Sequence, residues 1–216
     1  MAHATANAEA AGRSDEIMVY PDVLVRDFDG WGRYGGWLLG PHAAPADGMD
    51  DILFVRELVH RIGEHYCVDP SRVFATGHSW GGDMAAVAGC FLGDVFRAVA
   101  PAAANRPYWF EPVEGEVGCV GSAAVWTFFG VADEHFAASQ DHPGQFGEEQ
   151  AAFWRAQNGC GAGEEALPVD GGEGCVAYAG CAEETRYCLY GPETGHQIPP
   201  YFTDAVLAWF RGFEPE

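Results

Sequence analysis

The run Gly77-His78-Ser79-Trp80-Gly81 constrains this chain more than any other feature of its sequence. It has the Gly-x-Ser-x-Gly spacing of a nucleophile elbow, where a strand turns so sharply into a helix that bulky neighbours of the serine are excluded. Residues 72–76 before it are rich in β-formers, and residues 83–91 after it contain the helix-formers Met and Ala. The motif therefore predicts a strand, a tight turn and a helix, with Ser79 as the nucleophile at the turn.

A serine hydroxyl becomes a nucleophile only when a histidine takes its proton and a carboxylate orients that histidine. After an elbow of this kind the order along the chain is serine, acid, histidine. Asp133 and His196 each follow a run with the composition of a buried strand, in that order. We expect Ser79, Asp133 and His196 to form a catalytic triad. The alternatives are a capping role for Asp133, with Glu134 as the acid, and a surface-loop position for His196.

The backbone N–H of Trp80 is the expected oxyanion donor, because it follows the nucleophile and opens a helix. A second donor usually comes from a His-Gly loop after an earlier strand, and the sequence contains no His-Gly pair. His78 and three residues close to strand ends, Trp80, Trp109 and Tyr108, are candidates for contact with the substrate. The alternative for each aromatic residue is an ordinary place in the core.

The order of elements predicts one α/β domain over residues 1–216, a usual length for a single domain. Alternation of strands and helices is typical of a mostly parallel sheet flanked by helices. The segment 23–47, rich in Gly, Trp and Pro, is expected to be an ordered loop, and residues 1–13 part of a helix. Apolar runs predict strands at 17–20, 72–76, 98–101, 123–129 and 185–190, and helical patterns lie at 50–62, 83–91, 147–157 and 201–213.

The charge balance excludes some classes of partner. Eleven basic and 32 acidic residues give a net charge of -21, which repels nucleic-acid phosphates and anionic lipid heads. The sequence has no apolar run of about 18 residues that would insert into a membrane. It also has no His-Glu-x-x-His motif, phosphate loop or nucleotide fingerprint. We therefore expect no metal, no cofactor, no nucleic acid and no membrane insertion.

Seven cysteines are more than a cytosolic enzyme of this size usually carries, so the sequence favours a secreted protein with disulfides. Cys160, Cys175, Cys181 and Cys188 are placed to close one or two loops around the last strand. Cys90 has two interpretations that remain open, a buried helix thiol or a disulfide. The spacing leaves the connectivity undetermined.

Several motifs together resemble the extracellular polyhydroxybutyrate depolymerase and feruloyl esterase family of α/β-hydrolases. The resemblance covers the chain from about Asp15 onward. It implies the α/β-hydrolase fold and a secreted serine hydrolase that cleaves esters, either of hydroxyalkanoate polymers or of feruloyl and acetyl groups on plant polysaccharide. The motifs are Val19-Tyr20-Pro21-Asp22, residues 66–74 leading into Gly77-His78-Ser79-Trp80-Gly81-Gly82-Asp83-Met84, residues 96–101, 129–133 and 154–160, and Gly195-His196.

The sequence departs from the family pattern in two places. The early strands and the His-Gly oxyanion loop are missing, and the acid motif continues with Glu134-His135-Phe136 in place of an apolar segment and a proline. In the family a strand lies between the one matching 17–20 and the one leading to Ser79, so its absence predicts a gap in the sheet. We expect an N-terminally truncated chain, in which Cys67 has lost its partner.

Two other functions fit parts of the sequence. A prolyl-oligopeptidase-like serine peptidase shares the Gly-x-Ser-x-Gly-Gly motif and the order of the triad, but it normally carries a propeller domain, and the sequence has no propeller repeats. A non-catalytic binding protein with the same fold would account for the missing oxyanion loop. An ester substrate with catalysis through an acyl-enzyme is the leading hypothesis.

Overall fold

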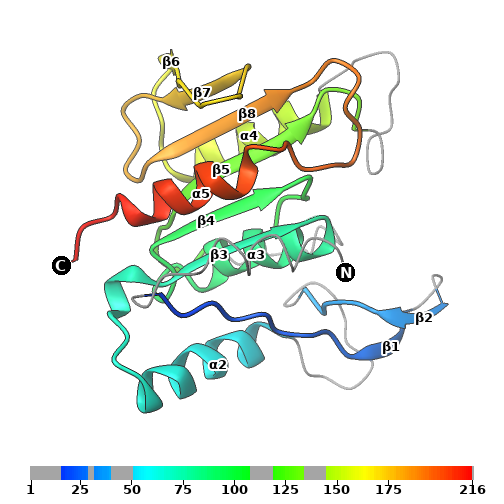
Figure 1. Ribbon diagram of the computed structural model, residues 1–216, viewed down its shortest axis with the longest axis vertical. Coiled ribbons are helices and arrows are strands. Elements are labelled where there is room, and N and C mark those ends of the chain that lie inside the picture. Colours follow the sequence, from blue (N-terminus) through cyan, green and yellow to red (C-terminus); the bar gives the residue numbers. More distant parts are fainter. Residues whose placement is uncertain (1–15, 29–31, 40–50, 108–118, 134–144, 216) are drawn as a thin grey trace.

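The computed structural model describes residues 16–28, 32–39, 51–107, 119–133 and 145–215. A six-stranded sheet runs through most of this part of the chain, in the order β3-β4-β5-β8-β7-β6 (Figure 1). The first four strands of that order are parallel, and β7 and β6 continue the sheet antiparallel. The strands are β3 (Phe74–His78), β4 (Ala98–Ala102), β5 (Ala124–Gly130), β6 (Glu164–Ala166), β7 (Cys175–Tyr178) and β8 (Thr185–Tyr190).

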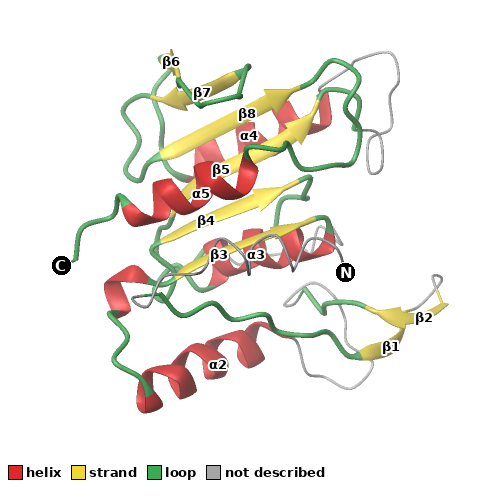
Figure 2. Cartoon of the chain, viewed as in Figure 1, coloured by secondary structure: helices red, strands yellow, loops and turns green. Residues whose placement is uncertain are grey.

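Helices cover both faces of the sheet (Figure 2). The helices α3 (Trp80–Phe91) and α4 (Gln145–Gln157) lie on one face and α5 (Phe202–Arg211) on the other. Alternate residues of the central strands supply the two cores, since side chains along a strand point to opposite faces. Val99 and Val125 pack with α3, while Trp126 and Phe128 pack with α5. This arrangement confirms the predicted parallel sheet between helical layers.

The helix α2 (Asp51–His65) and a small hairpin lie beyond the β3 edge of the sheet (Figure 1). The hairpin consists of β1 (Val25–Phe28) and β2 (Gly32–Gly35), which pair antiparallel and form a separate sheet. Arg26 of β1 donates two hydrogen bonds to Asp51, of 2.8 and 3.0 Å, and one to the carbonyl oxygen of Gly36. This bidentate ion pair fastens the hairpin to the start of α2.

Two sequence-based expectations for the N-terminal region are wrong. Residues 17–20 are not a strand, and Ile17, Val19 and Tyr20 are 50%, 43% and 44% exposed. An apolar run becomes a buried strand only where another strand pairs with it, and no described strand pairs with this one. The expected gap inside the sheet is therefore not observed, because β3 forms the edge of the six described strands. The hairpin lies in 23–47, which was expected to be a loop.

The remaining elements predicted within the described residues are confirmed, the strand 185–190 with the predicted bounds and the others with shifted bounds. A short helical turn, η1 (Pro70–Arg72), precedes β3, and its first N–H groups are capped by Asp69, which accepts a 2.9 Å bond from the Ser71 backbone N–H. The strands β6 and β7 were not predicted. The expected helix at 1–13 lies outside the described residues. None of the helices in the described part of the chain is long and apolar enough to cross a membrane.

Three disulfides join parts of the described chain: Cys90–Cys119, Cys160–Cys181 and Cys175–Cys188. The second and third close two loops beside β8, as expected, and the first shows that Cys90 is not a free helix thiol. Among the described cysteines, Cys67 alone is outside a disulfide, and it is exposed.

Candidate active site

The elbow around Ser79 has the shape that its sequence predicts. Ser79 joins β3 to α3 with φ of 56°, in the left-handed region that residues other than glycine rarely adopt. A Cβ on Gly77 would collide with the backbone of Gly81, and a Cβ on Gly82 would lie 2.7 Å from the carbonyl oxygen of Ala102. Position 81 itself has open space around it. Glycine is therefore required at 77 and 82, which lets the turn bring the serine forward.

The structure brings Ser79, Asp133 and His196 together at the carboxyl ends of β3, β5 and β8, a group that we call the Ser-His-Asp cluster. The Ser79 Oγ lies 2.7 Å from His196 Nε2. The other ring nitrogen, Nδ1, lies 3.1 and 3.2 Å from the two carboxylate oxygens of Asp133. The Asp133 side chain is 1% exposed and that of His196 19%. A buried carboxylate thus fixes the ring, while part of the His196 side chain is exposed.

The loops that carry the acid and the histidine support each other. The backbone N–H of Ala132 donates a 2.9 Å bond to the carbonyl oxygen of Thr194. A Cβ on Gly130 would collide with that same carbonyl, so glycine at the end of β5 permits the close approach. The Tyr190 hydroxyl donates to the carbonyl oxygen of Gln197, next to the histidine. The distance between Asp133 and His196 therefore depends on two loops packed directly together.

The start of α3 offers a site for negative charge. Ser79 is the N-cap residue, but its side chain makes no capping bond, so the hydroxyl is directed to His196 instead. Trp80 is the first helical residue, and the first N–H groups of a helix have no partner within the helix. The predicted oxyanion donor, the Trp80 N–H, therefore lies at the end of the helix that favours an anion.

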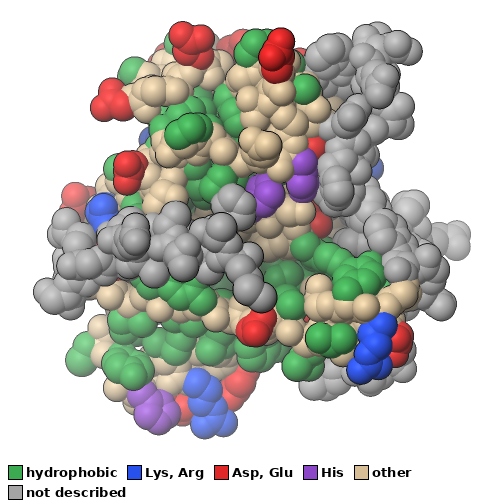
Figure 3. Space-filling view, turned by 45° about the vertical axis from the view of Figure 1, so that its right-hand side comes forward, with side chains coloured by type: hydrophobic (Ala, Val, Ile, Leu, Met, Phe, Trp, Pro, Cys, Tyr) green, Lys and Arg blue, Asp and Glu red, His purple; other side chains and the backbone are tan. Residues whose placement is uncertain are grey.

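The predicted substrate-contact residues fall into three groups. The His78 ring lies 4.9 Å from the His196 ring, between centroids. The Trp80 ring contacts two hairpin residues, Phe28 at 5.0 Å and Tyr34 at 5.5 Å, and all three are half-buried. Figure 3 shows histidine side chains beside a hydrophobic patch on this face of the molecule. The third group, Trp109 and Tyr108, lies outside the described residues, as does Glu134.

Asp83 is a residue of this region that the sequence did not single out. It lies in the first turn of α3, is 3% exposed, and accepts a 2.6 Å hydrogen bond from the backbone N–H of Asn105. Burial raises the pKa of its carboxyl from 3.8 to about 7, although the bonds from Asn105 and the nearby charge of His196 oppose the rise. In the sequence Asp83 is an acidic residue near a helix start, which is common and unspecific, and it lies within the longer motif 77–84 without a role of its own.

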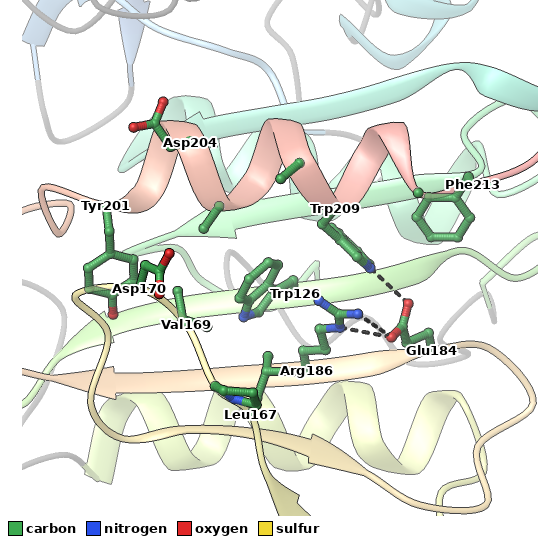
Figure 4. A pocket seen from close by; sticks show the side chains of 14 residues that line it. Trp126, Leu167, Val169, Asp170, Glu184, Arg186, Tyr201, Asp204, Trp209 and Phe213 are labelled. Carbon is green, nitrogen blue, oxygen red and sulfur yellow. Dashed lines mark hydrogen bonds and ion pairs between the residues drawn. The ribbon is translucent and has the colours of Figure 1, made fainter.

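A separate cavity of about 740 Å³ lies along α5 and contains no member of the Ser-His-Asp cluster. Figure 4 shows Arg186 between two tryptophans and in contact with Glu184. The guanidinium carbon lies 4.9 Å from the Trp126 ring and 5.3 Å from the Trp209 ring, and Glu184 accepts a bond from the Trp209 indole. Since Trp209 belongs to α5 and the others to the sheet region, these contacts hold the helix in place.

The sequence is similar to feruloyl esterases. Feruloyl esterase B of Piromyces equi is 45% identical over 97 residues, which are 44% of this chain and 18% of that protein. Feruloyl esterase C of Emericella nidulans is 25% identical over 202 residues, which are 93% of this chain and 64% of that protein. The chain thus spans less than two thirds of the length of these relatives. No family model matches it.

Solved structures establish the fold class. Acetyl xylan esterase from Aspergillus awamori has a TM-score of 0.61 and 16% identity, over 82% of this chain and 73% of that one. A variant of SOBER1 from Arabidopsis thaliana has a TM-score of 0.54 and 14% identity, over 96% and 89%. Likeness at such low identity concerns the fold alone. With the mostly parallel sheet and the elbow, it confirms that the chain has the α/β-hydrolase fold.

Proposed function

We propose that this protein is a serine carboxylic ester hydrolase that works through an acyl-enzyme. One observation carries the proposal: the hydrogen-bonded chain from Ser79 through His196 to Asp133, at the tip of the elbow. These three groups have the residue types, order and contacts that make a serine hydroxyl nucleophilic. In the described part of the chain, no group of His, Cys, Asp and Glu side chains is arranged to hold a metal.

In the proposed reaction the members of the Ser-His-Asp cluster act in sequence. Ser79 Oγ attacks the ester carbonyl carbon while its proton passes to His196 Nε2, and Asp133 stabilises the resulting imidazolium. The Trp80 N–H stabilises the oxyanion. Collapse of this intermediate breaks the ester bond, and His196 protonates the departing alcohol. Water then attacks the acyl group on Ser79, with His196 again taking and returning the proton, which releases the acid and the free enzyme.

The proposed substrates are feruloyl or acetyl esters of plant polysaccharide. The names of the relatives support this choice, since two are feruloyl esterases and one solved neighbour is an acetyl xylan esterase. The half-buried rings of Phe28, Tyr34 and Trp80 pack together around the residue that follows the nucleophile, and we propose that they contact the acyl group. The three disulfides support a secreted protein, because such bonds persist in oxidising compartments.

The test is hydrolysis by the protein produced under oxidising conditions, compared with its Ser79→Ala variant. The substrates are p-nitrophenyl acetate, methyl ferulate, acetylated xylan and polyhydroxybutyrate. We expect release of ferulate or acetate by the wild type and none above background by the variant. Equal rates for the two proteins on every substrate would contradict an esterase role.

A fluorophosphonate probe separates the remaining alternatives. It labels an activated serine whatever the natural substrate is, so a protein that only binds ligands would stay unlabelled. Labelling at Ser79 together with cleavage of a prolyl peptide, and without ester hydrolysis, would favour the peptidase hypothesis instead. Activity on polyhydroxybutyrate alone would shift the substrate from plant esters to polyesters.

A further inference from the structure

Asp83 and Asn105 form a buried polar pair directly behind the nucleophile, and the proposed mechanism does not use either residue. Asp83 Oδ1 accepts bonds from the backbone N–H of Asn105 at 2.6 Å and from its side-chain amide at 3.3 Å. The two residues are 3% and 2% exposed. A carboxylate removed from water is costly unless hydrogen bonds compensate it, so its presence here calls for a reason beyond packing.

The pair closes a ring of hydrogen bonds through the nucleophile. The Ser79 backbone N–H donates to the carbonyl oxygen of Ala102 at 3.0 Å, and the Ser79 carbonyl accepts from the Asp83 N–H at 2.8 Å. Ala102 is the last residue of β4, and Asn105 lies in the turn that follows it. Asn105 in turn donates to the Asp83 carboxylate. The backbone of Ser79 is therefore held on both sides by groups that the Asp83–Asn105 pair connects.

Both segments of this ring contain strained backbone. Ser79 and Ala103 are the two described non-glycine residues with positive φ, at 56° and 48°. Such conformations persist only where surrounding contacts enforce them. The Ala103 N–H donates to the Phe128 carbonyl at 2.8 Å, which fixes the turn to β5 as well. The turn after β4 is thus clamped between α3 and β5, with Asp83 on the α3 side.

We propose that Asp83 is a positioning residue, whose ionised carboxylate holds Asn105 and, through the turn after β4, keeps Ser79 in its strained reactive conformation. This inference rests on the proposed esterase function only for its kinetic part. Among the residues that the structure describes, His196 is the titratable group that interacts with the Asp83 charge, and Asp133 contacts the other nitrogen of the same imidazole. Arg106 follows Asn105, and its backbone N–H is bound by Gln150 of α4.

Two variants separate the charge of Asp83 from its hydrogen bond. Asp83→Asn keeps an oxygen that accepts from Asn105 but removes the charge, whereas Asp83→Leu removes both. Because a misplacement of about 1 Å can lower a rate by about 100-fold, we expect a fall of that order in kcat for Asp83→Leu. For Asp83→Asn we expect a fall of about 10-fold, since bonds to ionised acceptors are about twice as strong as neutral ones. KM for p-nitrophenyl acetate should stay nearly unchanged in both.

The pH profile distinguishes this role from a purely structural one. The Asp83 carboxyl, whose pKa burial raises to about 7, gains a proton as the pH falls through that value and then resembles the side chain of Asp83→Asn in charge. The ratio of kcat/KM between the wild type and Asp83→Asn should therefore fall from about 10 on the alkaline side toward about 1 on the acidic side of that pKa. Asp204→Asn, an exposed change on α5, is the matched control, and its ratio to the wild type should not vary with pH.

Hydrogen exchange tests whether the Asp83–Asn105 pair holds the Ser79 backbone, and it does not depend on enzymatic activity. The amide protons of Ser79 and Asn105 should exchange at least about 10-fold faster in Asp83→Leu or Asp83→Asn than in the wild type. The proposal would be overturned by unchanged exchange and rate in Asp83→Asn, with a ratio to the wild type that does not vary with pH. Faster exchange with wild-type kinetics would overturn it as well. If Ser79→Ala shows that the protein is not an esterase, the kinetic tests no longer apply, and hydrogen exchange at Ser79 and Asn105 alone tests the positioning role of Asp83. If Asp83→Leu does not fold, Asp83→Asn carries the test.

Discussion

The ring of Phe28 lies 5.0 Å from the ring of Trp80, so the β1–β2 hairpin contacts the residue that directly follows the nucleophile. Phe28 belongs to β1 of the two-stranded sheet, whereas Trp80 is the first residue of α3. A Cβ on Gly36 would meet the Trp80 indole at 2.6 Å, which shows how closely the end of the hairpin approaches. The hairpin therefore packs against the first residue of α3, and we expect it to line the acyl side of the proposed ester site.

Phe28→Ala should weaken hydrolysis of aromatic esters more than that of acetyl esters. The substitution removes one of three rings that would contact a feruloyl group, and each aromatic pair contributes about 0.5–1.5 kcal/mol beyond its burial. We expect kcat/KM for methyl ferulate to fall about 10-fold and that for p-nitrophenyl acetate by much less. The exposed Arg33→Ala on the same hairpin is the control. Equal losses on both esters would argue against an aromatic subsite.

Asp133→Asn should lower kcat by about 10⁴-fold while leaving the fold intact, as the equivalent change does in a well-studied serine protease. The amide cannot stabilise the imidazolium, and it favours the wrong tautomer of His196. Circular dichroism serves as the check on folding. Near-normal activity would indicate that another carboxylate provides the acid, and the double variant with Glu134→Gln would then identify it.

Asp83→Asn should stabilise the protein at alkaline pH. The folded pKa of Asp83 is about 7 and its ordinary value 3.8. With a raised folded pKa, the stability that this group contributes is complete below about pH 4 and is lost as the pH rises through 7. Asparagine does not ionise, so the free energy of unfolding of Asp83→Asn should rise relative to that of the wild type from pH 4 to pH 8, by a few kcal/mol. Thermal unfolding of both proteins across that range measures it, and a constant difference would contradict the raised pKa.

The paired variant Cys160→Ser with Cys181→Ser should lower the free energy of unfolding by about 3 kcal/mol, as expected for a disulfide that closes a loop of this size. Urea unfolding without reductant measures the change. Cys67→Ser is the matched control, because this exposed cysteine is outside the described disulfides. A similar loss in the control would show that Cys67 stabilises the protein in another way.

The sequence predicted those parts of the site that depend on local patterns or on chain order. The glycines at 77 and 82 specify the elbow because no other residue fits beside that turn. Asp133 and His196 could be chosen because each follows an identifiable strand in the order that the elbow requires. Their hydrogen bonds in the structure agree with that choice, and their catalytic roles remain predictions.

Features that depend on distant partners could not be predicted. The run 17–20 has a strand-like composition, but pairing with another strand decides whether a strand forms. The hairpin strands are only four residues long, and one of them begins and ends with glycine. Asp83 gains its importance from Asn105, 22 residues further along, and no spacing rule connects the two. The disulfide pairing could not be predicted either, because it depends on which cysteines the fold brings close together.

The hairpin is separate from the main sheet, so the residues expected to contact the substrate and the residues expected to react lie in different structural elements. The Ser-His-Asp cluster lies at the ends of β3, β5 and β8. The rings that pack on Trp80 belong to β1 and β2, and the Arg26–Asp51 ion pair joins β1 to the start of α2. A change in the hairpin can therefore alter what the site accepts without disturbing the groups that react. Variants of the hairpin sequence that keep Arg26 would therefore be the first to test when the aim is to change which esters the protein hydrolyses.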